Sequence, residues 1–270
     1  MVLVLLLAFS AVRPLPAQVH ASERAGSLLV NGALGVATVG VRQVITGQFS
    51  WRGLAQGAAG GMVMSAGKQI TGTGFVGSGL VGRQVNAVCI SLVASAHKDT
   101  LVLFVPLGPF SLEARPRVER RLRPRVDAAD FAVLLYNLLD GPTHLDWGAT
   151  LSAGAPVFGR PGDQMPLGYD AAGFALMGTV FLSDDLEWTV SERRRLLAHE
   201  SIHVLQWDAI RQLVSFPVER AAVQHLPVLR HAGRYVDAGI LAPGMMFLVA
   251  SQIPYEKHPW EREAYRLTGR

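Results

Sequence analysis

Cysteine is nearly absent from this chain of 270 residues, in which Cys89 is the only one. A single thiol excludes an intramolecular disulfide and any zinc site built from several cysteines. Charged side chains are also scarce, at 17 % of the residues, whereas hydrophobic residues make up 50 % and the mean hydropathy is +0.27. Such a composition predicts either a deeply buried helical part or contact with a membrane.

Signatures of nucleotide and nucleic-acid binding are incomplete, although the net charge is +4. The segment Gly72–Gly77 spells G-x-G-x-x-G, but it lacks the hydrophobic strand that precedes a dinucleotide-binding turn. The densest basic stretch, Arg115–Arg125, carries no aromatic side chains of the kind that stack on bases. We therefore expect no nucleic-acid partner. We interpret this stretch, which Pro116 and Pro124 interrupt, as a solvated connector or hairpin turn.

The first ten residues, MVLVLLLAFS, form an apolar run that is too short to cross a bilayer of about 30 Å. The run fits the apolar core of a secretory signal with cleavage options after Ala17 or Ala21, although no basic residue precedes Arg13. We expect residues 1–21 to be a signal peptide. The protein is then exported, either secreted or retained in the periplasm or cell envelope.

Residues 22–98 form a block rich in glycine and other small residues, in which glycines recur at helical intervals. Small residues at such a spacing allow helices to approach closely. The longest uncharged stretch of the block, Ala25–Val41, is at the lower edge of the length that spans a membrane. We therefore expect a tightly packed, glycine-rich helical module, or one that lies on a membrane or partner surface, rather than an inserted segment.

The segment His199–His203, HESIH, is an instance of H-E-x-x-H. On a helix, two histidines at this spacing lie one turn apart on the same face, about 5–6 Å between their β-carbons, so both reach one metal ion. The intervening Glu200 is placed to take a proton from a metal-bound water. The pattern predicts a hydrolytic zinc site with His199 and His203 as ligands. The alternative is a pair of ordinary histidines on an amphipathic helix.

The surrounding sequence predicts that this motif lies on a helix. Thr189 and Glu192 match the Thr-x-x-Glu pattern of a capping box, and Ser191 is a second candidate for the N-cap. From Ser191 to Ile210 the chain contains no Gly or Pro and keeps apolar residues near helical spacing. A helix that begins just before the motif follows from these signals.

A third protein ligand must come from outside the motif. The longer pattern H-E-x-x-H-x-x-G-x-x-H is absent, because Gln206 and Ala209 occupy the positions of its glycine and last histidine. Further along the chain, carboxylates and an imidazole that suit the role remain as alternatives. They are Glu219, His258, Glu261 and Glu263.

Between the glycine-rich block and the motif, short runs of β-forming residues alternate with Gly and Pro turns. Thr100–Leu107 is closed by a Gly-Pro turn and followed by a pairing candidate at Phe110–Arg117, and Ala175–Leu182 precedes the motif helix. Shorter strand candidates are His144–Thr150 and Val157–Phe158. Antiparallel strands followed by packed helices imply an α+β domain over residues 99–270.

The segment Glu261–Tyr265, EREAY, resembles the E-x-E-A-D pattern that follows H-E-x-x-H in gluzincin-type zincin metallopeptidases. By this resemblance, which covers the last third of the chain, Glu261 is the third zinc ligand and Glu200 the general base. Tyr265 departs from the pattern, which has an aspartate at that position. In the family, this aspartate forms a hydrogen bond that orients a zinc-binding histidine. The resemblance also implies a zincin-like domain with a short antiparallel or mixed sheet, whose edge strand, at Gly178–Leu182, holds an extended peptide.

The function that these patterns predict is that of an exported zinc metallopeptidase with a peptide or protein substrate. Its Zn²⁺ is bound by His199, His203 and Glu261, and Glu200 acts on the attacking water. The alternative is a non-catalytic zincin-like envelope protein, in which the glycine-rich module binds a membrane or a partner. An open, water-bearing metal site would favour catalysis, and a closed site with four protein ligands would favour structure.

Overall fold

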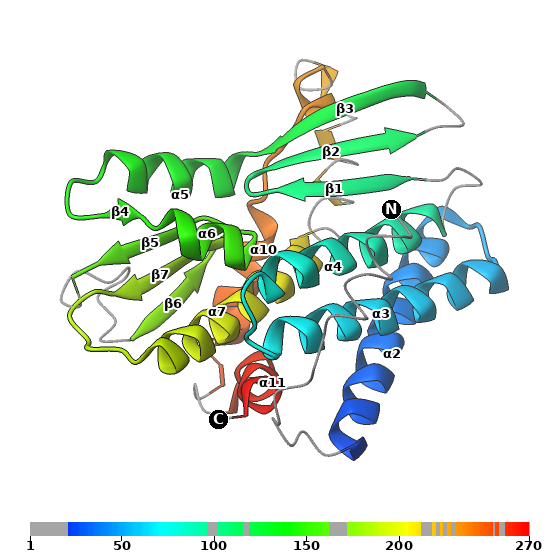
Figure 1. Ribbon diagram of the computed structural model, residues 1–270. Helices are drawn as coiled ribbons and strands as arrows, with labels where there is room; N and C mark the ends of the chain where they lie inside the picture. The colour runs from blue at the N-terminus through cyan, green and yellow to red at the C-terminus, as the bar shows by residue number, and fades with distance from the viewer. Residues whose placement is uncertain are drawn as a thin grey trace.

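The computed structural model describes residues 21–96, 102–115, 119–161 and 172–211, and beyond them 218–219, 222–223, 226–227, 231–250, 252–253 and 257–269. The described residues form two four-stranded sheets and a set of helices that pack against them (Figure 1). The expected α+β class is confirmed. Except for Ala21, the predicted signal peptide lies outside the described residues.

Three consecutive helices form the glycine-rich block, namely α2 (Ala21–Thr46), α3 (Trp51–Gly72) and α4 (Ser78–Ser95). Helix α3 packs between α2 and α4. A β-carbon added to Gly35 of α2 would lie 2.0 Å from the carbonyl oxygen of Gly57 in α3. One added to Gly67 of α3 would lie 2.8 Å from the carbonyl oxygen of Gly82 in α4. The expected close approach of helices at glycines is therefore confirmed.

Within the described part of the chain, helix α2 packs against α3 and leaves another side exposed. Its segment Arg24–Val44 is long and apolar enough to cross a membrane, judged by length and composition, and it lies near the N-terminus. Signal sequences and membrane anchors share these properties, so the helix is compatible with export without establishing it. The side of α2 that faces away from α3 exposes large apolar side chains, namely Leu29, Val30, Leu34, Val41 and Val44.

The first sheet has the strand order β1-β2-β3-β8. Strands β1 (Leu103–Leu107), β2 (Phe110–Arg115) and β3 (Glu119–Asp127) are antiparallel, and β8 (Val236–Asp237) pairs with β3 in parallel. The predicted hairpin around the Gly-Pro turn is confirmed by the pairing of β1 with β2. In Figure 1 this sheet lies above α4, and its strand β1 contacts that helix.

Of the two interpretations of Arg115–Arg125, the solvated connector is wrong, because most of this stretch belongs to strand β3. The hairpin is supported at the start of the stretch, where β2 and β3 are antiparallel and Arg115 pairs with Glu119. Arg125 of β3 is buried and forms an ion pair with Asp237, with 2.6 Å between Nη2 and Oδ1. Strand β8 pairs only with the last two residues of β3. At Pro124, β3 therefore has a described neighbour on one side only, β2, and a proline is tolerated at such an edge position.

The second sheet has the strand order β4-β5-β7-β6, with β5 (Val157–Arg160) and β7 (Thr179–Ser183) parallel at its centre. The segment Ala175–Leu182, expected as one strand, contains the end of β6 (Gly173–Leu176) and most of β7. They are joined by a tight turn in which Met177 and Gly178 have φ angles of 46° and 71°. The expectation missed this turn because a methionine at positive φ is uncommon.

The expected strand His144–Thr150 is confirmed only in its first two residues, which form β4 (His144–Leu145). Asp146 then caps a helix, α6 (Trp147–Ala153), because its side chain accepts a hydrogen bond from the backbone N–H of Ala149. Further helices in the described part of the chain are α5 (Ala128–Leu139), α10 (Leu241–Ala250), α11 (Pro259–Thr268) and a 3₁₀ turn, η4 (Ala232–Arg234). Of these, α5 contacts both sheets and α11 packs against other helices.

Helix α7 (Val190–Ile210) carries the H-E-x-x-H motif and runs between the second sheet and the glycine-rich helices (Figure 1). The predicted capping box is present. Thr189 Oγ1 accepts the backbone N–H of Glu192 at 3.2 Å, and Glu192 Oε2 accepts the backbone N–H of Thr189 at 3.0 Å. The predicted start of the motif helix is therefore confirmed.

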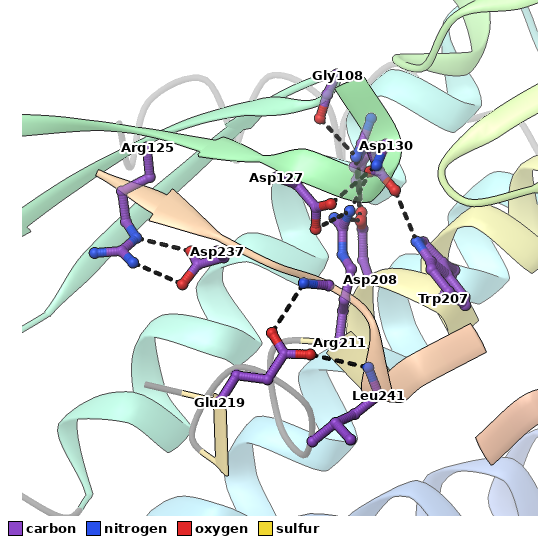
Figure 2. A network of polar contacts seen from close by, with 12 residues as sticks. Gly108, Arg125, Asp127, Asp130, Trp207, Asp208, Arg211, Glu219, Asp237 and Leu241 are labelled. Atoms are coloured by element: carbon purple, nitrogen blue, oxygen red, sulfur yellow. Dashed lines mark hydrogen bonds and ion pairs between the residues drawn. The ribbon is translucent and has the colours of Figure 1, made fainter. Parts of the chain in front are cut away.

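The C-terminal end of α7 lies in a cluster of buried charges (Figure 2). Asp208 accepts hydrogen bonds from Arg83 and Arg211, and Arg211 also forms ion pairs with Asp127 and Asp130. Three carboxylates thus surround two guanidinium groups in this cluster. Burial raises the pKa of Asp130 to about 7 against the opposing charge of Arg211, and the neighbouring Asp127 and Asp208 add to the rise.

Candidate metal centre

The two motif histidines lie one turn apart on α7, with 3.2 Å between their Nε2 atoms. Glu261, in the first turn of α11, reaches both of them. Its Oε1 lies 3.3 Å from His203 Nε2, and its Oε2 lies 3.4 Å from His199 Nε2. These three residues form a group that could hold a metal ion, with ligand atoms within 4.8 Å of one another. The structure therefore brings together the three residues that the sequence and the resemblance single out.

Apolar packing between α7 and α11 places Glu261. Ile202, on the motif helix, forms a buried cluster with Ala264 and Leu267 of α11. The end of α3 meets the same helix, because a β-carbon on Gly72 would lie 2.5 Å from the carbonyl oxygen of Leu267. Pro259 occupies the start of α11, where its missing N–H costs nothing. With α11 held in this way, its first turn faces the histidines.

The three side chains suit a cation. His199 and Glu261 are only 3 % and 6 % exposed, and Glu261 Oε2 is buried with no hydrogen-bond partner among the described residues. A buried carboxylate oxygen of this kind is costly unless a cation or donor satisfies it. Two imidazole nitrogens and a carboxylate match the donors of catalytic zinc sites, although other divalent transition metals accept the same set.

The electrostatics of the group also favour a positive charge at this point. Burial by itself lowers the pKa of His203, but contact with Glu261 and the charge of Glu200 outweigh it and raise the pKa to about 9. Burial acts to raise the pKa of Glu261, yet the close ring nitrogens of His199 and His203 hold that pKa well below its usual range. The site thus attracts a proton or a metal ion between its three side chains.

Glu200, the predicted general base, is 5 % exposed and faces the second sheet. A β-carbon on Gly173 of β6 would lie 3.1 Å from Glu200 Oε1. Since β6 stands at the end of the described strand order, the edge strand beside the motif helix is Gly173–Leu176. The expectation of an edge strand at Gly178–Leu182 is wrong, because most of that segment belongs to β7, which pairs with a strand on each side.

The alternative third ligands have other contacts and lie outside the metal-binding group found among the described residues. Glu263 forms an ion pair with Lys68, with 2.7 Å between Oε2 and Nζ. Glu219 accepts hydrogen bonds from the backbone N–H groups of Gly239 and Leu241, each at 2.9 Å (Figure 2). His258 Nε2 lies 2.6 Å from the carbonyl oxygen of Ile253. Each of these contacts explains the residue without a metal.

Tyr265 stands where the gluzincin pattern has its aspartate. Its ring packs against the ring of His199, with 4.6 Å between centroids and 52° between planes. His199 Nδ1 is buried and finds no hydrogen-bond partner in the described part of the chain. Tyr265 therefore contacts the histidine through its ring, which differs from the hydrogen-bonding role that the resemblance gives to the aspartate.

Three residues near the site escaped the sequence-based reasoning, namely Gln206, Lys68 and Asn31. Gln206 follows His203 by three residues and so lies on the same helix face, a spacing that could have revealed it. Lys68 and Asn31 lie in the glycine-rich block, and no local pattern connects them to the motif. Comparisons of this chain with protein-family models, curated proteins and solved structures found no match.

Proposed function

We propose that the protein is a zinc-dependent metallohydrolase of zincin-like architecture that cleaves peptide bonds. The observation that carries the proposal is the convergence of His199, His203 and Glu261, whose facing nitrogen and oxygen atoms lie 3.2–3.4 Å apart. Glu200 directly follows His199 on α7 and lies beside the edge strand β6. Two nitrogen ligands, one carboxylate ligand and an adjacent carboxylate base are what a hydrolytic zinc site requires.

Zinc, when bound by these three residues, supplies a lowered water pKa and a polarised substrate carbonyl. Glu200 accepts the proton of the attacking water and passes it to the leaving amine. The edge of β6 pairs with an extended peptide through backbone hydrogen bonds, so that the scissile carbonyl lies beside Glu200. Burial of the site limits bulk water, which strengthens the interaction of Glu200 with the developing charges.

Elemental analysis and a peptide-cleavage assay test this proposal together. We expect about one zinc per wild-type chain, loss of zinc in Glu261→Ala and His203→Ala, and retained zinc without hydrolysis in Glu200→Gln. Glu187→Gln, at an exposed position before α7, serves as the matched control and keeps both properties. Zinc retained in both ligand variants, or hydrolysis by Glu200→Gln at the wild-type rate, would contradict the proposal.

The outer face of α2 supports a second role, binding to the surface of an anionic lipid bilayer. The five large apolar side chains described above are 55–81 % exposed, and no charged residue occurs within Ala25–Val41. Exposed Phe49 and Trp51 follow the helix and pack edge to face, as aromatic residues do at membrane interfaces. Exposed Arg24 and Arg52 flank this surface and complement anionic headgroups.

Co-sedimentation with phosphatidylglycerol-containing vesicles tests this surface. We expect the wild type to pellet with anionic vesicles and Leu34→Glu to remain largely in solution, because the charge would enter the apolar boundary. Leu122→Glu, at an exposed position of β3, is the control and pellets like the wild type. Equal pelleting of both variants would contradict the assignment, and a dimer that Leu34→Glu dissociates would assign the face to a second copy of the chain.

A further inference from the structure

The metal-binding histidine His203 makes a second contact that fixes its ring. Its Nδ1 lies 2.8 Å from Oε1 of Gln206. Gln206 Nε2 donates to the carbonyl oxygen of Trp260 at 3.1 Å and to Oε2 of Glu263 at 2.9 Å. Both of those partners are acceptors, so reversing the amide would place its oxygen against two other oxygens. The amide of Gln206 is therefore held in one orientation.

This orientation selects a tautomer of His203. Because Oε1 of Gln206 can only accept, His203 Nδ1 must donate and carry the proton. A histidine that binds a metal is neutral and has one N–H, so Nε2 of His203 then supplies the lone pair. Nε2 is also the atom that faces Glu261, at 3.3 Å. Gln206 thus directs the lone pair of His203 toward the proposed metal position.

Glu263, which orients Gln206, is in turn held by the glycine-rich helices. Lys68 Nζ donates to Glu263 Oε2 at 2.7 Å and to Asn31 Oδ1 at 3.1 Å. Asn31 Nδ2 donates to Glu263 Oε1 at 3.2 Å. Lys68, on α3, and Asn31, on α2, are 5 % and 2 % exposed. A buried ammonium group is costly without a carboxylate partner, so Lys68 keeps Glu263 at this point.

We propose that Lys68 is a positioning residue for the metal ligand His203, acting through Glu263 and Gln206. The inference rests on the proposed metal site and extends it, since it makes the glycine-rich helices part of the metal centre. Lys68 fixes the carboxylate of Glu263, this carboxylate fixes the amide of Gln206, and the amide fixes the ring of His203. Partners of this kind typically change metal affinity 10–100-fold when they are removed.

Zinc affinity, measured by competition with a chromophoric chelator, tests the order of this chain of contacts. We expect Lys68→Met and Gln206→Leu each to weaken zinc binding about 10–100-fold. The double variant binds no more weakly than Gln206→Leu, because Lys68 acts only through that residue. Arg266→Met, an exposed substitution on helix α11, keeps wild-type affinity. Losses that add in the double variant would overturn the proposal.

Two further measurements check that each variant folds and show which nitrogen of His203 carries the proton. Circular dichroism checks each variant, and where Lys68→Met does not fold, Lys68→Met with Glu263→Leu removes both charges and should still weaken zinc binding. In zinc-free protein, at a pH where the ¹⁵N chemical shifts show that the His203 ring is neutral, the same spectra report which ring nitrogen is protonated. We expect the Nδ1–H form in the wild type and a mixture in Gln206→Leu.

The spectra also separate this inference from the proposed function. A wild-type His203 in the Nε2–H form would overturn the inference even if zinc binds. A wild type in the Nδ1–H form that binds no zinc would refute the metallohydrolase and leave the contacts from Lys68 to His203 intact.

Discussion

The contact between α2 and α3 allows a sharp test of the glycine-rich packing. A β-carbon on Gly61 of α3 would lie 1.9 Å from the carbonyl oxygen of Asn31 and 2.8 Å from the α-carbon of Gly32, both in the backbone of α2. Ordinary van der Waals contact begins at 3.4 Å. Gly61→Ala therefore requires the two helices to separate by roughly 1.5 Å, since neither backbone atom can rotate away.

The expected magnitude follows from two opposing effects. Inserting a methyl group into a packed contact costs typically about 1–3 kcal/mol. Replacing a helical glycine by alanine returns about 0.8–1 kcal/mol of helix propensity. Gly26 of α2 isolates the second effect, because a β-carbon there would meet nothing within 4 Å. We expect Gly61→Ala to lower the free energy of unfolding by up to ~2 kcal/mol and Gly26→Ala to raise it by up to ~1 kcal/mol.

Urea unfolding followed by circular dichroism provides the assay. The midpoints should fall in the order Gly61→Ala, wild type, Gly26→Ala, with similar slopes. If both variants were stabilised to the same extent, helix propensity alone would govern them. The close approach of α2 and α3 would then be refuted.

Three further predictions concern other parts of the chain. With the pKa of Asp130 raised to about 7, the folded state binds a proton that the unfolded state releases near pH 4, so stability falls as pH rises between these values, by up to ~1.4 kcal/mol per pH unit. Asp130→Asn should flatten this slope in unfolding curves, and an unchanged slope would contradict the assignment. Burial raises the pKa of the Cys89 thiol to about 12, so a maleimide should label it only in denaturant; rapid native labelling would be the contrary result. Asp146→Ala, which removes the N-cap of α6, should cost about 1 kcal/mol in urea unfolding, and a stability equal to wild type would count against the cap.

The sequence predicted the motif helix and its start because the determinants are local. The capping box at Thr189 and the uninterrupted run after it need no distant partner. The third ligand, Glu261, came from a resemblance over five residues, and the structure supports that choice by placing Glu261 3.3–3.4 Å from both histidines. Motif spacing was therefore enough to find the two histidines, whereas the third ligand depended on the resemblance.

What the sequence did not predict depends on contacts between distant segments. From the sequence alone, Arg125 is expected on the surface. It is buried because it pairs with Asp237, which lies more than a hundred positions away in the chain. Likewise, Lys68 lies 195 positions from Glu263 in the chain, and only the packing of α3 against α11 brings them together. The turn at Met177 was hidden for a different reason, because it uses a backbone conformation that methionine seldom adopts.

Helix α11 is the last of the described elements, yet it contributes both Glu261 and Glu263. The contacts that join α11 to Gln206 of α7 and Lys68 of α3 span 57 and 195 positions, so each closes a long loop at an entropic cost. A growing chain can hold α3, α7 and both sheets and still lack its third ligand. The proposed peptidase would therefore be inert until α11 docks against α7.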